Sequence, residues 1–197
     1  MNLLTEKSMT CSGAFPLMAS NSGEFVFNQP RVHQAVMPAA NGISNAHSLA
    51  RIYALLIGDV NENGNTAACL LSKKTLQLAT ENVTPPDEHD QALFGLMTKF
   101  SRGGFELYGD FFNVLGEDGF GHKDVRCIFS LLNSKNSAIP FFLLLGMGGS
   151  LAFASSSRQL AFAYVFNQLD FSTLTTDPRN LQIFKIIDTI IKEKTVS

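Results

Sequence analysis

The chain has 197 residues, of which 45% are hydrophobic and 16% are charged. This composition is too apolar for a disordered chain and too evenly mixed for a fibre or a coiled coil, and the length suits one ordinary domain or a large piece of a bigger one. The formal net charge of −2 provides no basic surface for a phosphate backbone, so no nucleic acid is expected as a partner.

The cysteines give no sign of a metal site or of a disulfide framework. Cys11, Cys69 and Cys127 lie far apart, form no Cys-x-x-Cys pair and have no histidine at metal-ligand spacing, so we expect no metal and no cofactor. The N-terminal residues lack a basic segment followed by an apolar stretch, and the apolar run at 138–154 is interrupted by glycines. A soluble intracellular protein without a secretory signal or a membrane contact is therefore expected.

The first predicted helix begins at Ser44. Residues 1–24 show no clear period and are predicted as a loop or as the remnant of a region that begins upstream. After them, apolar residues fall at positions i, i+3, i+4 and i+7, which is typical of an amphipathic helix. Ser44 is the expected N-cap and Gly58 the expected end. The residues of this apolar stripe are Leu49, Ile52, Tyr53 and Leu56.

Residues 59–65 superficially resemble a calcium-binding loop, because carboxylates and amides alternate along them. A calcium loop needs a bidentate glutamate at its twelfth position, where this chain has Leu70. We therefore expect a polar turn between helices. A second short helix is predicted from an N-cap at Ser72 to about Glu81, before the proline pair at 85–86 breaks the chain.

Strands are predicted in the second half of the chain. Short apolar pieces around glycines at 92–108 favour two strands joined by a turn. Residues 149–155 and 159–167 are predicted as a hairpin joined by a turn at 155–158. Large side chains alternate with small ones along its second strand, so the two faces should differ in side-chain size.

The last predicted element is a C-terminal helix. Asp177 is placed to cap it, Pro178 takes the first helical position, and Phe184, Ile187 and Ile191 form an apolar stripe. The order of all these elements predicts an α/β (α+β) domain in which helices pack on a largely antiparallel sheet.

Several short motifs occur along the chain in one order. Residues 38–42 read Pro-Ala-Ala-Asn-Gly before the first predicted helix, residues 70–76 read Leu-Leu-Ser-Lys-Lys-Thr-Leu at the second, and residues 148–150 read Gly-Gly-Ser before a strand. Together these motifs resemble the serine β-lactamase-related family, the group of β-lactamases, penicillin-binding proteins and class C-like esterases. The segments that carry the resemblance are residues 27–32, 37–54, 70–76, 99–107, 120–122, 148–154, 160–167 and 177–179.

The resemblance implies a partial β-lactamase/transpeptidase-like fold with a largely antiparallel sheet and a packed C-terminal helix. It implies that residues 25–197 are the C-terminal portion of such a domain, with an unmatched insertion at 124–145. Family members hydrolyse esters or amides through an acyl-enzyme, using a Ser-x-x-Lys pair on one helix face and a Tyr-x-Asn or Ser-x-Asn motif. No serine here begins Ser-x-x-Lys, and no tyrosine begins Tyr-x-Asn. Ser134 and Asn136 have the Ser-x-Asn spacing, but with no nucleophile to serve this match is interpreted as a coincidence. No catalytic residue is therefore predicted.

A third family motif, Lys-Thr-Gly or His-x-Gly, lines the substrate on a strand next to the nucleophile. Here His122 and Lys123 are followed by Asp124, and a glycine comes only at Gly146. Removal of residues 124–145 would restore His-x-Gly before the Gly-Gly-Ser strand. The block is interpreted either as a surface insertion or as a translated unspliced intron. The substrate-binding residues implied by the resemblance are His122, Gly146, Gly148 and Gly149.

Two functions remain open on the sequence, and with them the question of whether the chain is an enzyme. The first is a truncated β-lactamase-related serine hydrolase, inactive in the form given, whose full-length form would take a small ester or amide substrate. The second is a non-catalytic pseudoenzyme or partner-binding fragment. Sheet edges and apolar faces left uncovered in a partial domain would then call for an oligomer or another partner. His122 itself is either a substrate-facing imidazole or a strand-end histidine without a role.

Overall fold

The computed structural model describes residues 28–36, 42–90, 96–109, 115–123, 150–165 and 178–196. The chain divides into two compact units, one made of Met1–Ser44 with His89–Met97 and the other of Asn45–Glu88 with Thr98–Ser197. The first unit contains the short helix α2 (Pro30–His33) and an antiparallel pair of strands, β3 (His89–Asp90) and β4 (Leu96–Met97). The second unit contains every other element.

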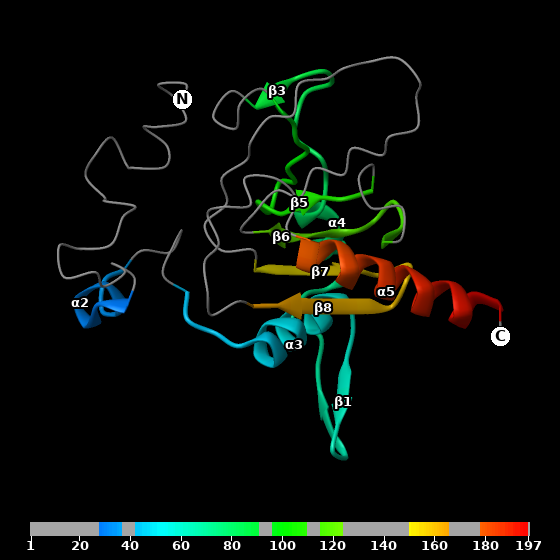
Figure 1. Ribbon diagram of the computed structural model, residues 1–197, viewed down its shortest axis with the longest axis horizontal. Coiled ribbons are helices and arrows are strands. Elements are labelled where there is room, and N and C mark those ends of the chain that lie inside the picture. Colours follow the sequence, from blue (N-terminus) through cyan, green and yellow to red (C-terminus); the bar gives the residue numbers. More distant parts are fainter. Residues whose placement is uncertain are drawn as a thin grey trace. The chain divides into compact units, whose positions relative to one another are not determined.

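The second unit is built on a four-stranded antiparallel sheet with the order β5-β6-β7-β8 (Figure 1). The coarse prediction of an α+β domain with a largely antiparallel sheet is confirmed. The strands of this sheet are β5 (Glu106–Leu107), β6 (Phe120–Lys123), β7 (Leu151–Ser155) and β8 (Leu160–Tyr164). The other elements are α3 (Ala46–Ile57), α4 (Lys73–Ala79), α5 (Pro178–Val196) and a separate hairpin of β1 (Val60–Glu62) and β2 (Asn65–Ala67).

The β7–β8 hairpin forms because large and small residues alternate along both strands. Phe153 pairs with Phe162 and Ala154 with Ala161, so successive pairs point to opposite faces of the sheet. The predicted hairpin is confirmed, although its turn lies at residues 156–159, one residue later than expected, with Gln159 at a positive φ of 48°. One face therefore carries aromatic and large aliphatic side chains and the other carries alanines.

Helix α3 covers the face that carries alanines. Tyr53 on this helix is buried in one cluster with Phe120, Ala152 and Ala154. Leu49 and Leu56 of the predicted stripe pack against the same cluster, as do Ala161 and Ala163 of β8. Methyl side chains leave room for the helix to approach the strands closely.

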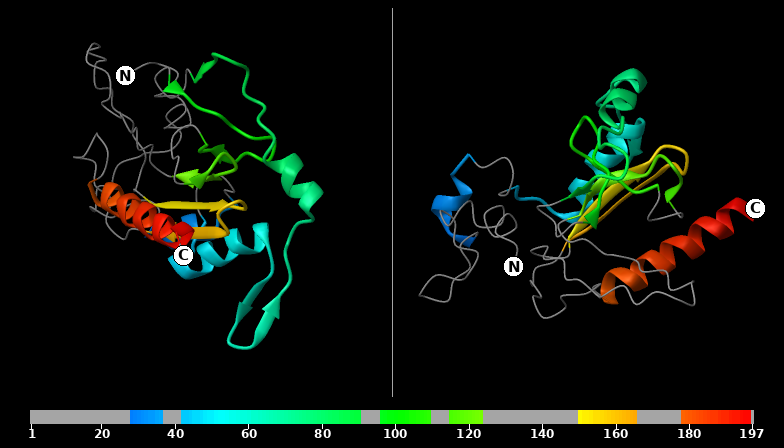
Figure 2. Two further views of the ribbon diagram at one scale, coloured as in Figure 1. Left: turned by 90° about the vertical axis from the view of Figure 1, so that its right-hand side faces the viewer. Right: turned by 90° about the horizontal axis from the view of Figure 1, so that it is seen from above.

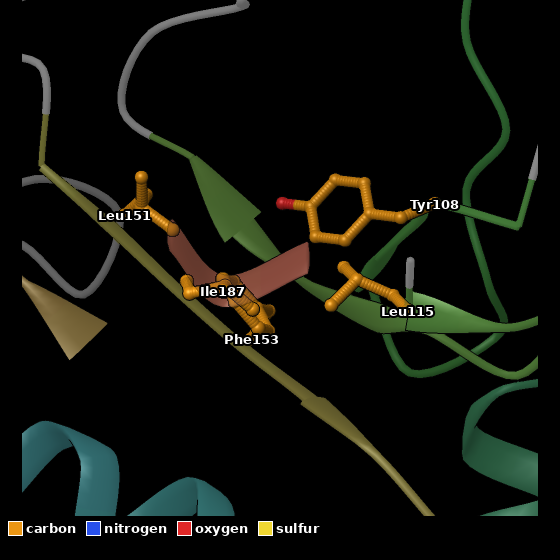
Figure 3. Packing of buried hydrophobic residues seen from close by; sticks show 5 residues of the cluster. All are labelled: Tyr108, Leu115, Leu151, Phe153 and Ile187. Carbon is orange, nitrogen blue, oxygen red and sulfur yellow. The ribbon is translucent and has the colours of Figure 1, made fainter. Parts of the chain in front are cut away.

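Helix α5 covers the opposite face, and Figure 2 shows α3 and α5 on the two sides of the β7–β8 hairpin. Ile187 of α5 is buried with Leu151 and Phe153 of β7 and with Tyr108 and Leu115 (Figure 3). Ile183 and Ile191, one turn to either side, pack against this cluster. The predicted C-terminal helix is confirmed, whereas Asp177 and the side chain of Phe184 lie outside what the structure describes.

Two details of the first predicted helix are wrong. The N-cap of α3 is Asn45, whose side-chain oxygen accepts a hydrogen bond from the Ser48 N–H at 2.8 Å, and Ser44 lies one residue outside it. Ile52 does not belong to the buried stripe, since 47% of its surface is exposed. The end at Gly58 is confirmed.

The turn expected between the first two helices is a β-hairpin. β1 and β2 pair in the register Glu62↔Asn65, which leaves Asn63 and Gly64 as a two-residue turn with φ angles of 51° and 79°. Positive φ at both positions is the signature of a type I′ turn, for which Asn-Gly is a preferred sequence. The prediction missed the strands because each has only three residues and most of them are polar.

The remaining predicted elements are partly confirmed. Ser72 caps α4, accepting from the Thr75 N–H at 3.1 Å, but the helix ends at Ala79 instead of Glu81. Two strands lie within residues 92–108, but β4 pairs with β3 and β5 pairs with β6, while only an isolated bridge joins Phe100 to Glu106. Across the described residues, no helix is both long and apolar enough to cross a membrane.

Candidate functional site

The candidate site centres on β6, the strand that carries His122. Phe120 pairs with Ala154, Gly121 with Phe153, and His122 with Ala152. Because side chains alternate along a strand, Phe120 and His122 lie on the face that α3 covers. Phe120 is buried with 1% of its surface exposed, whereas His122 is exposed. The strand therefore runs from the core at Phe120 to solvent at His122.

Gly121 holds β6 tightly against β7. A Cβ atom at this position would lie 2.7 Å from the Cα of Phe153 and would collide with the carbonyl oxygen of Ala152. Only a residue without a side chain allows this approach, so Gly121 fixes the position of the strand that presents His122. Gly121 was not predicted as a site residue. A glycine inside a predicted strand is the signal that could have identified it.

Three aromatic rings lie on the α3 side of the sheet where β6 is buried. The ring centroids of Phe105 and Phe120 are 5.0 Å apart, and each lies 6.3 Å from the centroid of Tyr53. Burial raises the pKa of Tyr53 to about 12, so its phenol stays protonated near neutral pH. Tyr53 can therefore support the wall behind β6, but it cannot act there as a phenolate base.

A polar cluster lies where the turn before β6 meets the β7–β8 turn. The carboxylate of Asp118 accepts hydrogen bonds from the Ser155 hydroxyl at 2.9 Å and from the Ser157 hydroxyl at 2.6 Å through the same oxygen. Its other oxygen accepts from the Ser157 N–H at 2.8 Å. This cluster was not predicted from the sequence, where the only signal was an Asp-Gly pair and a run of serines.

The Asp118 cluster is suited to holding turns together and not to catalysis. Burial raises the pKa of Asp118, but the hydrogen bonds from Ser157 and Ser155 outweigh it, and the pKa falls below its ordinary value. A carboxylate with a lowered pKa is a weak base, and no imidazole joins it to either serine among the contacts of the described residues. The two hydroxyls therefore lack the activation that a nucleophile needs.

Of the predicted substrate-binding residues, the structure describes His122 alone. Gly146, Gly148 and Gly149 lie outside the described residues, as does the unmatched block at 124–145. Within the ranges that the structure describes, no group of three or more His, Cys, Asp or Glu residues is placed to hold a metal ion. The candidate site is therefore the exposed imidazole of His122, the strand fixed by Gly121, and the aromatic support of Tyr53 and Phe105.

Comparison of the chain with protein-family models, with curated proteins and with solved structures gave no match. The family named from the sequence motifs therefore stays a prediction.

Proposed function

We propose that this chain supplies one wall of the substrate site of a β-lactamase-related serine hydrolase and does not itself catalyse hydrolysis. The fold would then be the C-terminal portion of a β-lactamase/transpeptidase-like domain. The observation that carries the proposal is the exposed imidazole of His122 on a sheet strand that Gly121 pins to its neighbour.

The proposed contact with substrate is a hydrogen bond from the imidazole of His122. A neutral imidazole has one N–H that donates a hydrogen bond and one nitrogen that accepts, so His122 can orient the carbonyl or the carboxylate of a small ester or amide. Its backbone is fixed by pairing with β7, which sets the point on the sheet from which the imidazole projects. In this proposal the imidazole binds and orients the substrate, and the nucleophile comes from outside the chain.

We expect no hydrolysis because the chain lacks an activated nucleophile among its described contacts. The sequence contains no Ser-x-x-Lys, Tyr53 remains a neutral phenol, and the serines near Asp118 have no activating imidazole among their described contacts. Acyl transfer needs a nucleophile with a base in hydrogen-bond reach. The hydroxyls of Ser155 and Ser157 have no such base among the hydrogen bonds described for them.

The proposal is tested first by an activity assay on the purified chain. With a chromogenic cephalosporin and with a short-chain nitrophenyl ester, we expect hydrolysis at the background rate for the wild type and for His122→Ala alike. Turnover that survives purification and disappears in His122→Ala would contradict the proposal, because His122 would then take part in the reaction.

A non-catalytic, partner-binding role is the second candidate, and one observation on α5 favours it. Ile187 is buried against the sheet, but its neighbours Ile186 and Ile190 expose 58% and 47% of their surface. In a partner-binding role, another copy or another protein would cover these two isoleucines, which lie one turn apart on the helix. Light scattering of the wild type and of a variant with Ile186→Lys and Ile190→Lys tests whether a second copy covers this surface. Self-association that the variant loses supports a dimer through α5, and monomers in both cases argue against it.

A further inference from the structure

The tip of the β1–β2 hairpin carries a feature that the proposed function does not use. We propose that Asn63 is a site of spontaneous deamidation and isoaspartate formation in the folded chain, with the backbone nitrogen of Gly64 as the attacking group. The inference is independent of the proposed hydrolase family, because it depends only on the geometry of this turn.

The turn leaves both reacting groups accessible. Asn63 and Gly64 are exposed, and a Cβ atom built on Gly64 would meet nothing within 4 Å. Among the contacts of the described residues, neither the Asn63 side-chain amide nor the Gly64 N–H has a hydrogen-bond partner. Since glycine has no side chain next to its nitrogen, the nitrogen can approach the side chain of the preceding residue with little steric hindrance.

The reaction is balanced without any cofactor. The nitrogen of Gly64 forms a bond to Cγ of Asn63, the bond from Cγ to the side-chain nitrogen breaks, and ammonia leaves with the proton that Gly64 gives up. The product is a five-membered succinimide ring. Water then opens this ring at either carbonyl, which yields aspartate or isoaspartate at position 63.

Two other asparagines in the same hairpin provide internal controls. Asn61 precedes Glu62 and accepts a hydrogen bond from the Thr66 hydroxyl through its side-chain oxygen. Asn65 precedes Thr66 and belongs to β2. Each is followed by a residue with a side chain, and each lies in a paired strand, so both should react more slowly than Asn63.

The modification would act on the contacts between the hairpin and α3. Glu62, next to Asn63, lies 3.0 Å from His47 Nε2 through one carboxylate oxygen and 3.4 Å from Arg51 Nε through the other. Isoaspartate adds one carbon to the backbone of a two-residue turn and places a new negative charge beside Glu62. The register of β1 and β2 should then loosen, and Glu62 should lose its fixed position against α3.

The test is to incubate the full folded chain at mildly alkaline pH and to follow the peptide that contains residues 60–67 by mass spectrometry, with enzymatic methylation of isoaspartate as the second readout. We expect deamidation at Asn63 several-fold faster than at Asn61 or Asn65. In Asn63→Gly, which keeps a residue suited to positive φ, the fast deamidation of this peptide should disappear and only the slower reaction at Asn61 and Asn65 should remain. A parallel sample in urea reports the rate in the unfolded chain.

The outcomes separate the two parts of the inference. Deamidation of Asn63 in urea but not in the folded chain would overturn the proposal, because the fold would then protect the amide. Hydrogen exchange at the amides of Asn65–Ala67 in β2 tests the consequence for the hairpin. Faster exchange in the modified chain supports loosening of the hairpin, and unchanged exchange with isoaspartate present would contradict it.

Discussion

The two faces of the β7–β8 hairpin are packed by different means. On the α3 face the strands present Ala152, Ala154 and Ala161, and the bulk comes from the helix and from β6, in Tyr53 and Phe120. On the α5 face the bulk comes from the strands themselves, where Phe153 stacks on Phe162 with ring centroids 5.3 Å apart. The difference shows that the α3 face depends on close approach, whereas the α5 face depends on large side chains.

Truncation of Phe153 tests the α5 face and should have the largest effect. The side chain is fully buried and meets Phe162, Leu151 and Ile187. Phe153→Ala should lower the free energy of unfolding by about 3–5 kcal/mol, because it removes apolar contacts and leaves a cavity. Urea denaturation measures the loss. Phe162→Ala, at a half-buried site, serves as the control, and an equal or larger loss there would contradict the ranking.

A side chain at Gly121 tests how closely β6 packs beside β7, where Gly121 pairs with Phe153. Gly121→Ala places a methyl group where the backbone of Phe153 lies, so β6 must move away from β7. We expect destabilisation by about 3 kcal/mol, the upper part of the range for overpacking. Gly58 is the matched control, since its backbone is extended and nothing lies within 4 Å of a built Cβ. Gly58→Ala should change stability by less than about 0.5 kcal/mol. Similar losses at both positions would refute the claim that β6 packs on β7 only because residue 121 has no side chain.

Asp118 links the turn before β6 to the turn that joins β7 and β8. Asp118→Asn replaces the charged acceptor, and we expect a loss of about 1–2 kcal/mol, since Ser155 is buried and keeps weaker partners. The pKa of Asp118 is lowered in the folded state, so its contribution is fully present above the ordinary pKa of an aspartate and is lost as pH falls through the folded value. Denaturation curves between neutral and acidic pH should therefore converge for wild type and variant. A constant gap at all pH values would contradict the role of the carboxylate.

The N-cap of α3 tests the end of the helix that packs on Ala152 and Ala154, and its removal should have the smallest effect. Asn45→Ala removes the acceptor of the Ser48 N–H and should cost about 1 kcal/mol. Ser44→Ala, one residue away, should cost less than Asn45→Ala, because Ser44 is not the N-cap of α3. Thermal unfolding of the two variants decides between the caps, and a larger loss for Ser44→Ala would favour the cap expected from the sequence.

Part of this fold could be predicted because side-chain periods are strong over its longer elements. Alternation along residues 160–164 and the helical spacing of Leu49, Tyr53 and Leu56 placed β8 and α3 nearly where they lie. The β1–β2 hairpin was missed because strands of three residues show no reliable period, although Asn63-Gly64 is a turn signal. Ser44 was predicted as the N-cap and Asn45 is the residue that caps, an error of one position between two residue types that both cap well.

The candidate site could be predicted only in part, for a different reason. His122 was identified from a motif, but its exposure depends on where β6 lies relative to α3, which no local pattern encodes. Gly121 is needed because Phe153, more than thirty residues away in the sequence, lies against it in the sheet. A contact between distant strands leaves no trace in the spacing of either segment.

The most direct test of the account is a titration of the folded chain with a β-lactam that carries a free carboxylate, observed through the imidazole resonances of its histidines. The wall proposal predicts that the His122 resonance shifts in a saturable way while those of His33, His47 and His89 stay in place, and that the response is lost in His122→Ala. Shifts of equal size at all four histidines, or none at His122, would contradict the proposal that His122 faces a substrate.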